Sequence, residues 1–302
     1  MNSLLIGGSP VGDGYPTLIF SELGINCNGD VGIAKQLIDV SIEAGCNATK
    51  TQKRSVDVVY SAEELSRPRE SPFGLTNGDL KRGLEFGKEE YDEIDAYCMK
   101  RDFAWLSSCW DEASVDFIAQ YNPPCFKIAS ACITDDNLLK HHLQYHKPLI
   151  ISTGMTTTRQ LDHAIEIVGT DNVALMHCIG VYPADPKTLN LRVIKTLKGR
   201  YNVPVGWSGH EIGLATTVAA VAMGANLVER HVTLDRSMFG SDQSASVEPQ
   251  GLKRLVRDIR VVENAMGDGV KRVLPAESVV ANKLRRVDTM KYETGGINGI
   301  FA

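Results

Sequence analysis

Two lysines lie inside apolar segments of the chain, where a positive charge is unusual. Lys50 falls within residues 48–52 (ATKTQ), and Lys127 falls within residues 125–129 (CFKIA). A buried ammonium group costs several kcal/mol, as an order of magnitude, unless an anion or a carboxylate meets it. Either lysine alone could serve a buried ion pair or form an imine with a carbonyl substrate. With nearby serine hydroxyls, the pair favours a cradle for phosphate and carboxylate groups; these serines are Ser108, Ser130, Ser152 and Ser208.

Two histidines, His210 and His231, end neighbouring segments that we expect to be adjacent strands. Their imidazoles would then lie close enough to share a metal ion, with Glu22, Asp242 or a substrate oxygen completing the ligands. Such a mixed nitrogen and oxygen set suits Mn²⁺ or Mg²⁺. Zinc is less attractive because no thiolate cluster accompanies the pair. A single histidine is usually structural, so the pair alone leaves a core role open.

Further polar residues stand at the ends of predicted strands, namely Gln52, Tyr182 and Glu229. Tyr182 and Trp207 fit either a core position or a wall facing a sugar. The other histidines, at positions 141, 142, 146 and 163, lie on predicted helices, and we expect them to be solvated.

A scaffold must bring these distant residues together, and the chain carries a regular pattern that supplies one. Short apolar runs, turns and amphipathic stretches alternate, which indicates βα units and a parallel sheet. The predicted strands are 17–22, 47–52, 103–107, 125–129, 148–152, 173–177, 204–206 and 227–231. The predicted helices are 32–44, 88–100, 112–120, 136–145, 157–168, 191–198, 212–223 and 249–265.

These units favour a single-domain α/β fold, a (β/α)8 TIM barrel, over an open doubly wound sheet. No GxGxxG or GxxxxGK[ST] loop is present, and in a barrel the carboxyl ends of all strands face one pocket. We expect an N-terminal segment at 1–16, the barrel at 17–286 and a short tail at 287–302. A long insertion at 55–87, containing Arg67-Pro68-Arg69, would lie on the functional face as a lid or a substrate wall.

Composition excludes several other classes of protein. The 302 residues have ordinary globular composition, and a formal charge of −5 argues against a nucleic-acid partner. No secretory leader is recognisable at residues 1–14, and the longest apolar run is too short and polar to span a membrane. Seven cysteines without a CxxC pair favour reduced thiols, so we expect a cytoplasmic protein.

A series of motifs resembles the sialic acid synthase family, which comprises N-acetylneuraminate synthase and its legionaminate and pseudaminate relatives. The motifs are ELGINCNGD (22–30), KTQK (50–53), FKIAS (126–130), ISTGM (151–155), GWSGHE (206–211), ERHVTLD (229–235) and GSDQSASVEP (240–249). The resemblance runs from about Thr17 to Arg286. Residues 65–68 and 84–86 are especially similar to the branch with the animal enzymes.

The resemblance implies a condensation of phosphoenolpyruvate with the open-chain aldehyde of an N-acyl-mannosamine-like sugar, free or phosphorylated. It assigns phosphoenolpyruvate to the two lysines and four serines above, and the metal to His210 and His231. The sugar would face Glu22, Gln52, Tyr182, Glu229 and Asp242. We expect Glu22, Lys50 and Lys127 to act in the chemistry, with the lysines stabilising charge rather than forming an imine.

The chain departs from the family pattern at several positions. Ala131-Cys132 stand where the family has an acidic residue after the lysine strand, and Cys27 replaces a histidine. Thr51 replaces a phenylalanine, and Gln243 replaces a histidine. The chain also stops where the family continues into a small antifreeze-like domain that contacts the sugar across a dimer. The 55–87 insertion or a separate closing domain would then cover the site, or the substrate would lack the N-acyl group that this domain contacts. A homodimer is an alternative that the sequence does not decide.

Three hypotheses follow from these observations. The first is an active metal-dependent nonulosonic acid synthase. The second is a catalytically lapsed barrel kept as a binding or scaffolding subunit, which the altered acidic position motivates. The third is a synthase acting on another aldose, or an aldolase that uses Lys127 as an imine.

Overall fold

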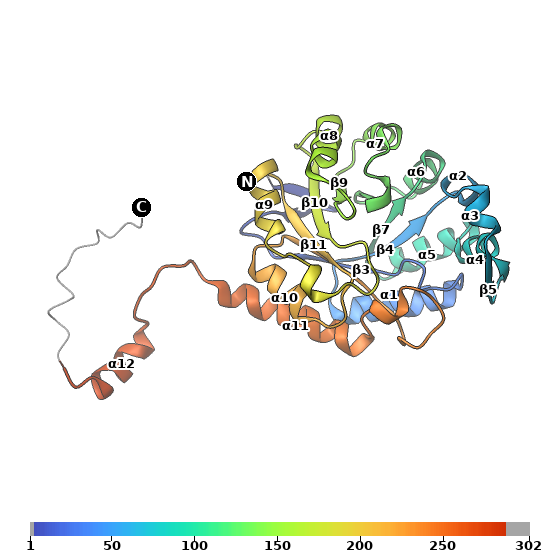
Figure 1. Cartoon of the computed structure of the whole chain (residues 1–302). Helices are drawn as coiled ribbons and strands as arrows, with labels where there is room; N and C mark the ends of the chain where they lie inside the picture. Colours follow the sequence, from blue (N-terminus) through green and yellow to red (C-terminus); the bar gives the residue numbers. More distant parts are fainter. Residues whose placement is uncertain (1–2, 288–302) are drawn as a thin grey trace. The chain divides into compact units, whose positions relative to one another are not determined.

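The computed structural model describes residues 3–287 of the chain (Figure 1). The chain divides into two compact units, Met1–Ala265 and Met266–Ala302. The first unit ends earlier than the predicted barrel domain of 17–286, and helix α12 (Pro275–Leu284) belongs to the second. The predicted tail from 288 onward lies outside the described residues. Within residues 3–287, no helix is both long and apolar enough to cross a membrane.

Eight parallel strands of the described chain close into a barrel, which confirms the predicted fold class. Strand β12 pairs with β3, placing Leu227 opposite Leu18 and His231 opposite Glu22. All residues of β3 and β10 are buried, as expected of parallel strands that are covered on both faces. The barrel strands are β3 (Leu18–Glu22), β4 (Ala48–Lys53), β7 (Ala104–Cys109), β8 (Phe126–Ile128), β9 (Leu149–Ser152), β10 (Val173–Cys178), β11 (Val205–Gly209) and β12 (Leu227–His231).

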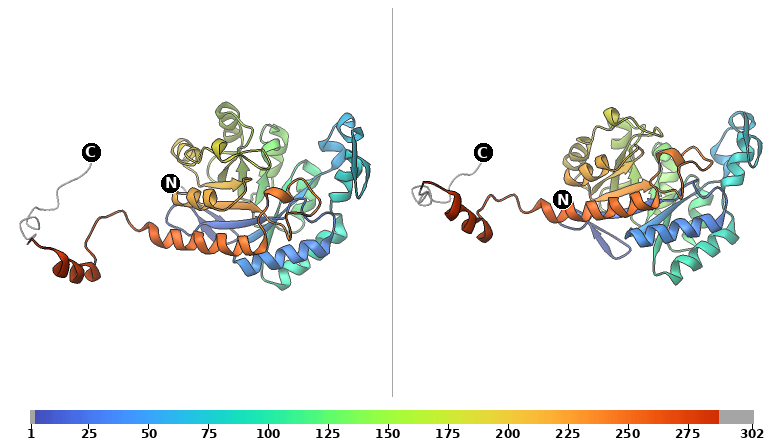
Figure 2. Two further views of the ribbon diagram at one scale, coloured as in Figure 1. Left: turned by 60° about the horizontal axis from the view of Figure 1, so that its bottom comes forward. Right: turned by 90° about the horizontal axis from the view of Figure 1, so that it is seen from below.

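Helices surround this barrel and match the predicted segments to within a few residues (Figures 1 and 2). Helix α1 begins after Asp30, whose carboxylate accepts from the backbone N–H groups of Gly32 and Ile33. Helix α10 begins later than predicted, and Gly213, with φ 97°, lies in the turn before it. The helices are α1 (Val31–Ala44), α5 (Lys88–Lys100), α6 (Glu112–Ala119), α7 (Asp136–Leu143), α8 (Thr158–Val168), α9 (Val193–Tyr201), α10 (Ala215–Ala222) and α11 (Pro249–Met266).

A small hairpin covers the amino-terminal end of the barrel, within the segment predicted only as 1–16. It pairs β1 (Leu4–Ile6) with β2 (Ser9–Val11). Its apolar side chains join a separate core cluster with residues from inside the barrel, including Phe20 and Leu106. The hairpin therefore closes the floor and leaves the carboxyl ends of the strands as the open face.

The insertion after β4 is folded rather than a bare loop, and it lies beside the loop that follows β12 (Figure 2). Its backbone packs against the loop after β3 at Gly29, where φ is 69° and an added Cβ would lie 2.2 Å from the Gly83 carbonyl oxygen. Only glycine suits this contact. The insertion contains α2 (Val56–Val59), α3 (Ala62–Ser66), β5 (Pro68–Ser71), β6 (Gly74–Thr76) and α4 (Asn77–Leu84).

One of the histidines predicted to be solvated is buried. His142 is fully buried on the inner face of α7, where its Nδ1 lies 2.8 Å from the carbonyl oxygen of Leu138 and its ring packs edge-on against Phe126. That prediction was wrong because the face of α7 that meets the barrel includes this position. The seven cysteines are all buried and free, as expected for reduced thiols.

Candidate functional site

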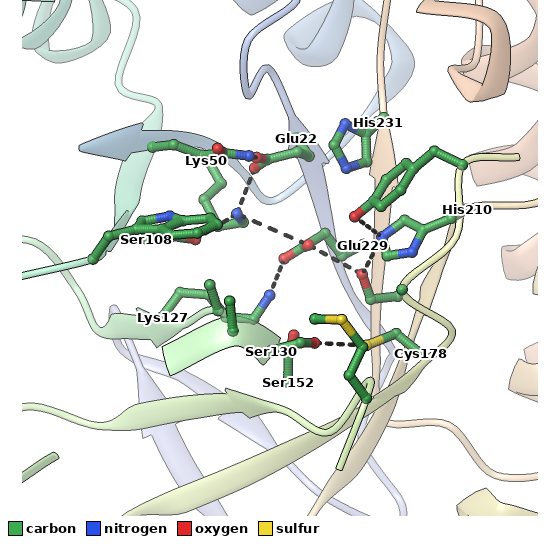
Figure 3. Close-up of a pocket in the computed structure, with 18 residues that line it drawn as sticks. Glu22, Lys50, Ser108, Lys127, Ser130, Ser152, Cys178, His210, Glu229 and His231 are labelled. Carbon is green, nitrogen blue, oxygen red and sulfur yellow. Dashed lines mark hydrogen bonds and ion pairs between the residues drawn. The ribbon is translucent and has the colours of Figure 1, made fainter. Parts of the chain in front are cut away.

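A pocket opens at the carboxyl ends of the barrel strands, and it gathers nearly all the predicted site residues (Figure 3). Its walls come from every barrel strand or from the residues directly following it. Asp242 is the exception, because it does not line the pocket and instead lies behind His231. The predicted residues in the lining are Glu22, Lys50, Gln52, Ser108, Lys127, Ser130, Ser152, Tyr182, Ser208, His210, Glu229 and His231.

Lys50 is held between two carboxylates and a hydroxyl on one side of the pocket. Its Nζ lies 2.6 Å from Glu22 Oε2, donates to Ser108 Oγ at 2.7 Å and lies 3.9 Å from Glu229 Oε1. Gln52 fixes the other oxygen of Glu22 by donating its Nε2 hydrogen at 2.8 Å. The Lys50 charge is therefore compensated in the free protein, and its orientation is set by β3, β4 and β7 together.

Lys127 forms a second buried pair on the opposite wall. Its Nζ donates to Glu229 Oε2 at 2.7 Å, and both side chains are at most 5% exposed. Ser208 donates to the other oxygen of Glu229 at 3.1 Å. Glu229 thus bridges the two lysines at the centre of the pocket (Figure 3). An anion that enters the pocket can form an ion pair with one or both ammonium groups, because Lys50 and Lys127 already line the cavity.

The two central carboxylates differ in their affinity for a proton. Burial raises the pKa of Glu22 to about 7, with Lys50 opposing the rise and Glu229 adding to it. Burial also works against ionisation of Glu229, but Lys127 and Lys50 hold its pKa well below the usual range. Glu229 is therefore a permanent anion, whereas Glu22 can gain or lose a proton near neutral pH.

His210 and His231 follow each other around the barrel, with ring centroids 5.4 Å apart. Burial lowers the pKa of His210 to about 4 and also lowers that of His231, so both rings are neutral near pH 7. His210 Nδ1 donates to the carbonyl oxygen of Ile179 at 2.6 Å, which leaves Nε2 to accept from the Tyr182 hydroxyl at 2.9 Å. His231 Nδ1 is buried without a hydrogen-bond partner, and Asp242 Oδ2 lies 3.6 Å away.

Such a pair of neutral imidazoles, one with an unsatisfied nitrogen, fits a divalent metal ion as part of a ligand set. Among residues 3–287, no preformed group of three or more histidine, cysteine and acidic side chains completes the shell. Water or substrate oxygens would supply the remaining positions, as hard cations such as Mg²⁺ and Mn²⁺ commonly accept.

The hydroxyl side of the pocket lies between β8, β9 and β10. Ser130 Oγ accepts from the backbone N–H of Gly154 at 3.1 Å and lies 3.3 Å from Cys178 Sγ. Ala131 lines the pocket, whereas Cys132 is buried beside it outside the lining, and burial raises the pKa of its thiol to about 12. The thiol is therefore protonated, and it supplies no negative charge at this wall.

Sequence reasoning missed several lining residues because their side chains carry no distinctive chemistry. Trp110 directly follows β7, and Met155 follows β9 in a left-handed conformation with φ 56°. Cys178 ends β10, and Gly180 follows it. Their position just beyond a strand end was the available signal. Trp207, by contrast, is fully buried, so it is a core residue and not a sugar-facing wall.

Comparison with known proteins gives concordant matches. A family model described as the NeuB family matches residues 37–271. The N-acetylneuraminate-9-phosphate synthase of Mus musculus is 37% identical over 93% of this chain and 79% of that protein. The N,N'-diacetyllegionaminic acid synthase of Campylobacter jejuni is 34% identical over 89% of this chain and 83% of that protein. The crystal structure of N-acetylneuraminic acid synthetase from Leptospira borgpetersenii superposes with a TM-score of 0.83 at 27% identity, covering 95% of this chain and 98% of that one.

Proposed function

Because the chain belongs to the NeuB family of phosphoenolpyruvate-dependent nonulosonic acid synthases, we propose that its acceptor is an N-acyl-mannosamine-like aldehyde, free or phosphorylated. The product is then a sialic-acid-type nonulosonic acid together with inorganic phosphate. The observation that carries this proposal is the arrangement of two buried lysines around Glu229 at the centre of the pocket. The hydroxyl side of the pocket and the two neutral histidines flank this centre.

Phosphoenolpyruvate carries a phosphate and a carboxylate, so it needs more than one cation. Lys50 and Lys127 supply these charges, and the hydroxyls of Ser108, Ser130, Ser152 and Ser208 supply neutral hydrogen bonds. Burial opposes the charged form of Lys50, but Glu22 and Glu229 raise the pKa of its ammonium group above the usual value. A charged amine suits charge stabilisation and disfavours imine formation at Lys50, because an imine requires a neutral amine. Lys127 is held in its ion pair with Glu229.

In the reaction, C3 of phosphoenolpyruvate forms the new bond to the aldehyde carbon, and the aldehyde oxygen gains a proton. Water adds at C2, and the bond between C2 and the bridging oxygen breaks, so phosphate leaves with that oxygen. Glu22, with a pKa of about 7 and facing the pocket, is the group able to give and take a proton here.

NeuB-family enzymes generally use a divalent metal, and His210 and His231 are the residues that would hold it in this chain. When bound, Mn²⁺ or Mg²⁺ supplies Lewis-acid polarisation of the acceptor carbonyl. Tyr182 contacts His210, and Gln52 holds Glu22; both line the pocket and would orient the sugar. Asp242 lies outside the lining, 3.6 Å from His231, and would act through that histidine. The free, buried cysteines support a reducing, cytoplasmic location.

The test is incubation of the pure protein with Mn²⁺, phosphoenolpyruvate and N-acetylmannosamine or its 6-phosphate, with released phosphate and ulosonic acid both measured. Phosphoenolpyruvate labelled with ¹⁸O at the bridging oxygen should pass its label to phosphate. Lys127→Met should abolish turnover, whereas Lys253→Met, at an exposed ion pair, should not. Binding of phosphoenolpyruvate without turnover of either acceptor would instead favour the lapsed, ligand-binding alternative.

Replacement of the family's acid by Ala131-Cys132 is the specific observation behind that alternative. Cys132→Glu is the direct variant to examine, because a carboxylate at this position would restore the acidic residue that the family pattern has. If turnover is already present in the parent protein, the acid is dispensable for this chain.

A further inference from the structure

A second cavity of about 300 Å³, here called the side cavity, lies between the insertion and two loops of the open face. It is separate from the pocket described above, and no lining residue is shared. Its lining residues are Ile25, Asn28, Arg69, Leu80, Lys81, Leu84, Phe239, Gly240 and Ser241.

The side cavity lies close to the pocket at the carboxyl ends of the strands, because the loops after β3 and β12 contribute to it. Ile25 and Asn28 follow β3, which ends at Glu22 in the pocket wall. Ser241 directly precedes Asp242, whose carboxylate lies 3.6 Å from His231 Nδ1. Consecutive Cα atoms are only about 3.8 Å apart, so the side cavity begins one residue away from the carboxylate that contacts His231 in the pocket wall.

Two cations line the side cavity, and none of the lining residues in the described part of the chain is acidic. Neither Arg69 nor Lys81 has an ion-pair partner among residues 3–287; Lys81 Nζ lies 5.1 Å from the ring centre of Tyr60. Arg69 makes one long hydrogen bond, 3.4 Å to Asn77 Oδ1. The neighbouring Arg82, by contrast, is already paired with Asp57.

The remaining basic residue of the insertion, Arg67, pairs with Glu64. The two basic residues of the insertion that have no ion-pair partner among residues 3–287 therefore both line the side cavity. Asn28 adds an amide group whose Nδ2 can donate to an anion, whereas the Ser241 hydroxyl already donates to Asp242 Oδ1 at 2.7 Å. Such a combination suits a phosphate monoester, which has several acceptor oxygens and up to two negative charges.

We propose that the side cavity binds the phosphate group of a phosphorylated acceptor sugar, and this inference rests on the proposed function. The aldehyde and the phosphate lie at opposite ends of the open sugar chain. With the aldehyde facing His210 and His231, the sugar extends past Asp242, and its phosphate meets Arg69 and Lys81. These two residues thus select the phosphorylated acceptor over the free sugar.

Binding can be measured without turnover by using the alditols, which lack the aldehyde. Titration calorimetry would compare N-acetylmannosaminitol 6-phosphate with N-acetylmannosaminitol, in the presence of Mn²⁺ and phosphoenolpyruvate. We expect the phosphorylated alditol to bind at least tenfold more tightly. Lys81→Met and Arg69→Met should each weaken it by about tenfold and leave the free alditol unchanged. Arg82→Met, one residue from Lys81 and already paired, is the matched control and should change neither.

The outcomes separate this inference from the proposed function. Equal binding of the two alditols, or equal losses in Lys81→Met and Arg82→Met, overturns the side cavity as a phosphate subsite. Inorganic phosphate that binds in a Lys81-dependent way, with no advantage for the alditol phosphate, also overturns it by marking a site for a free anion. Selective binding of the alditol phosphate without turnover of any aldehyde would sustain the subsite while the proposed function fails.

Discussion

Replacing Lys127 by methionine removes one partner of the buried pair at the centre of the pocket and leaves Glu229 charged. Both side chains are at most 5% exposed, and the Nζ–Oε2 distance is 2.7 Å. Breaking a buried pair from one side usually costs about 3–5 kcal/mol, because an ion remains without its partner in a low-dielectric surrounding. Lys50 Nζ still lies 3.9 Å from the other oxygen of Glu229. Because Lys50 still compensates part of this charge, we expect Lys127→Met to lower the free energy of unfolding by about 3 kcal/mol, the low end of that range.

Urea unfolding of the parent and the variants would measure this loss. Lys253 is the matched control, since it makes a 2.8 Å contact with Glu43 but is 41% exposed, and Lys253→Met should change stability far less. The double variant Lys127→Met, Glu229→Met removes both charges and should be more stable than Lys127→Met alone, although inactive. Equal losses in the two lysine variants, or no recovery in the double variant, would refute the reasoning.

Three further predictions concern other parts of the molecule. Burial lowers the pKa of His142 from 6.5 to about 4, so its contribution to stability is complete above pH 6.5 and falls by up to about 3 kcal/mol toward pH 4. Because burial lowers the pKa of His210 as well, His142→Leu should reduce the acid-side loss by about that amount without abolishing it, as measured by pH-dependent urea unfolding. Gly29→Ala should lower the free energy of unfolding by about 3 kcal/mol, since its Cβ would strike Gly83, whereas Gly267→Ala, also at positive φ but in open space, should cost about 1. Chelation should abolish turnover and Mn²⁺ restore it, and His210→Asn should weaken Mn²⁺ binding measured by electron paramagnetic resonance, leaving the fold intact.

The barrel could be predicted from sequence because each strand is a short apolar run followed by a helix of regular period. Polar residues at the ends of such runs, for example Lys50 and Glu229, had to share one face once the strands were parallel. The same reasoning did not predict the β1–β2 hairpin or the burial of His142. The hairpin is too short to show a period, and burial of a helix face depends on which neighbour covers it.

The sequence also did not predict which acidic residue forms an ion pair with which lysine in the pocket. Nothing in the order of residues says that Glu22 pairs with Lys50 while Glu229 pairs with Lys127, because all four side chains point into one pocket and either acid could meet either lysine. The side cavity was missed for the same reason, because Arg69 and Ser241 become neighbours only when the insertion folds against the loop after β12. The homodimer and the separate closing domain stay predictions.

Closure of the barrel between β3 and β12 also bears on how the chain reaches its folded state. Thr17, just before β3, donates to the carbonyl oxygen of Ala225, 208 residues later. At about 5–20 residues per second, synthesis of that stretch takes roughly ten to forty seconds, during which one edge of β3 lacks its final partner. An unpaired apolar strand edge invites pairing with other chains, so this interval is the one in which the nascent protein most needs protection. Glu229 lies on β12, so its ion pair with Lys127 can form only after this stretch has been synthesised, whereas the pair of Glu22 with Lys50 joins the neighbouring strands β3 and β4 and does not depend on that closure.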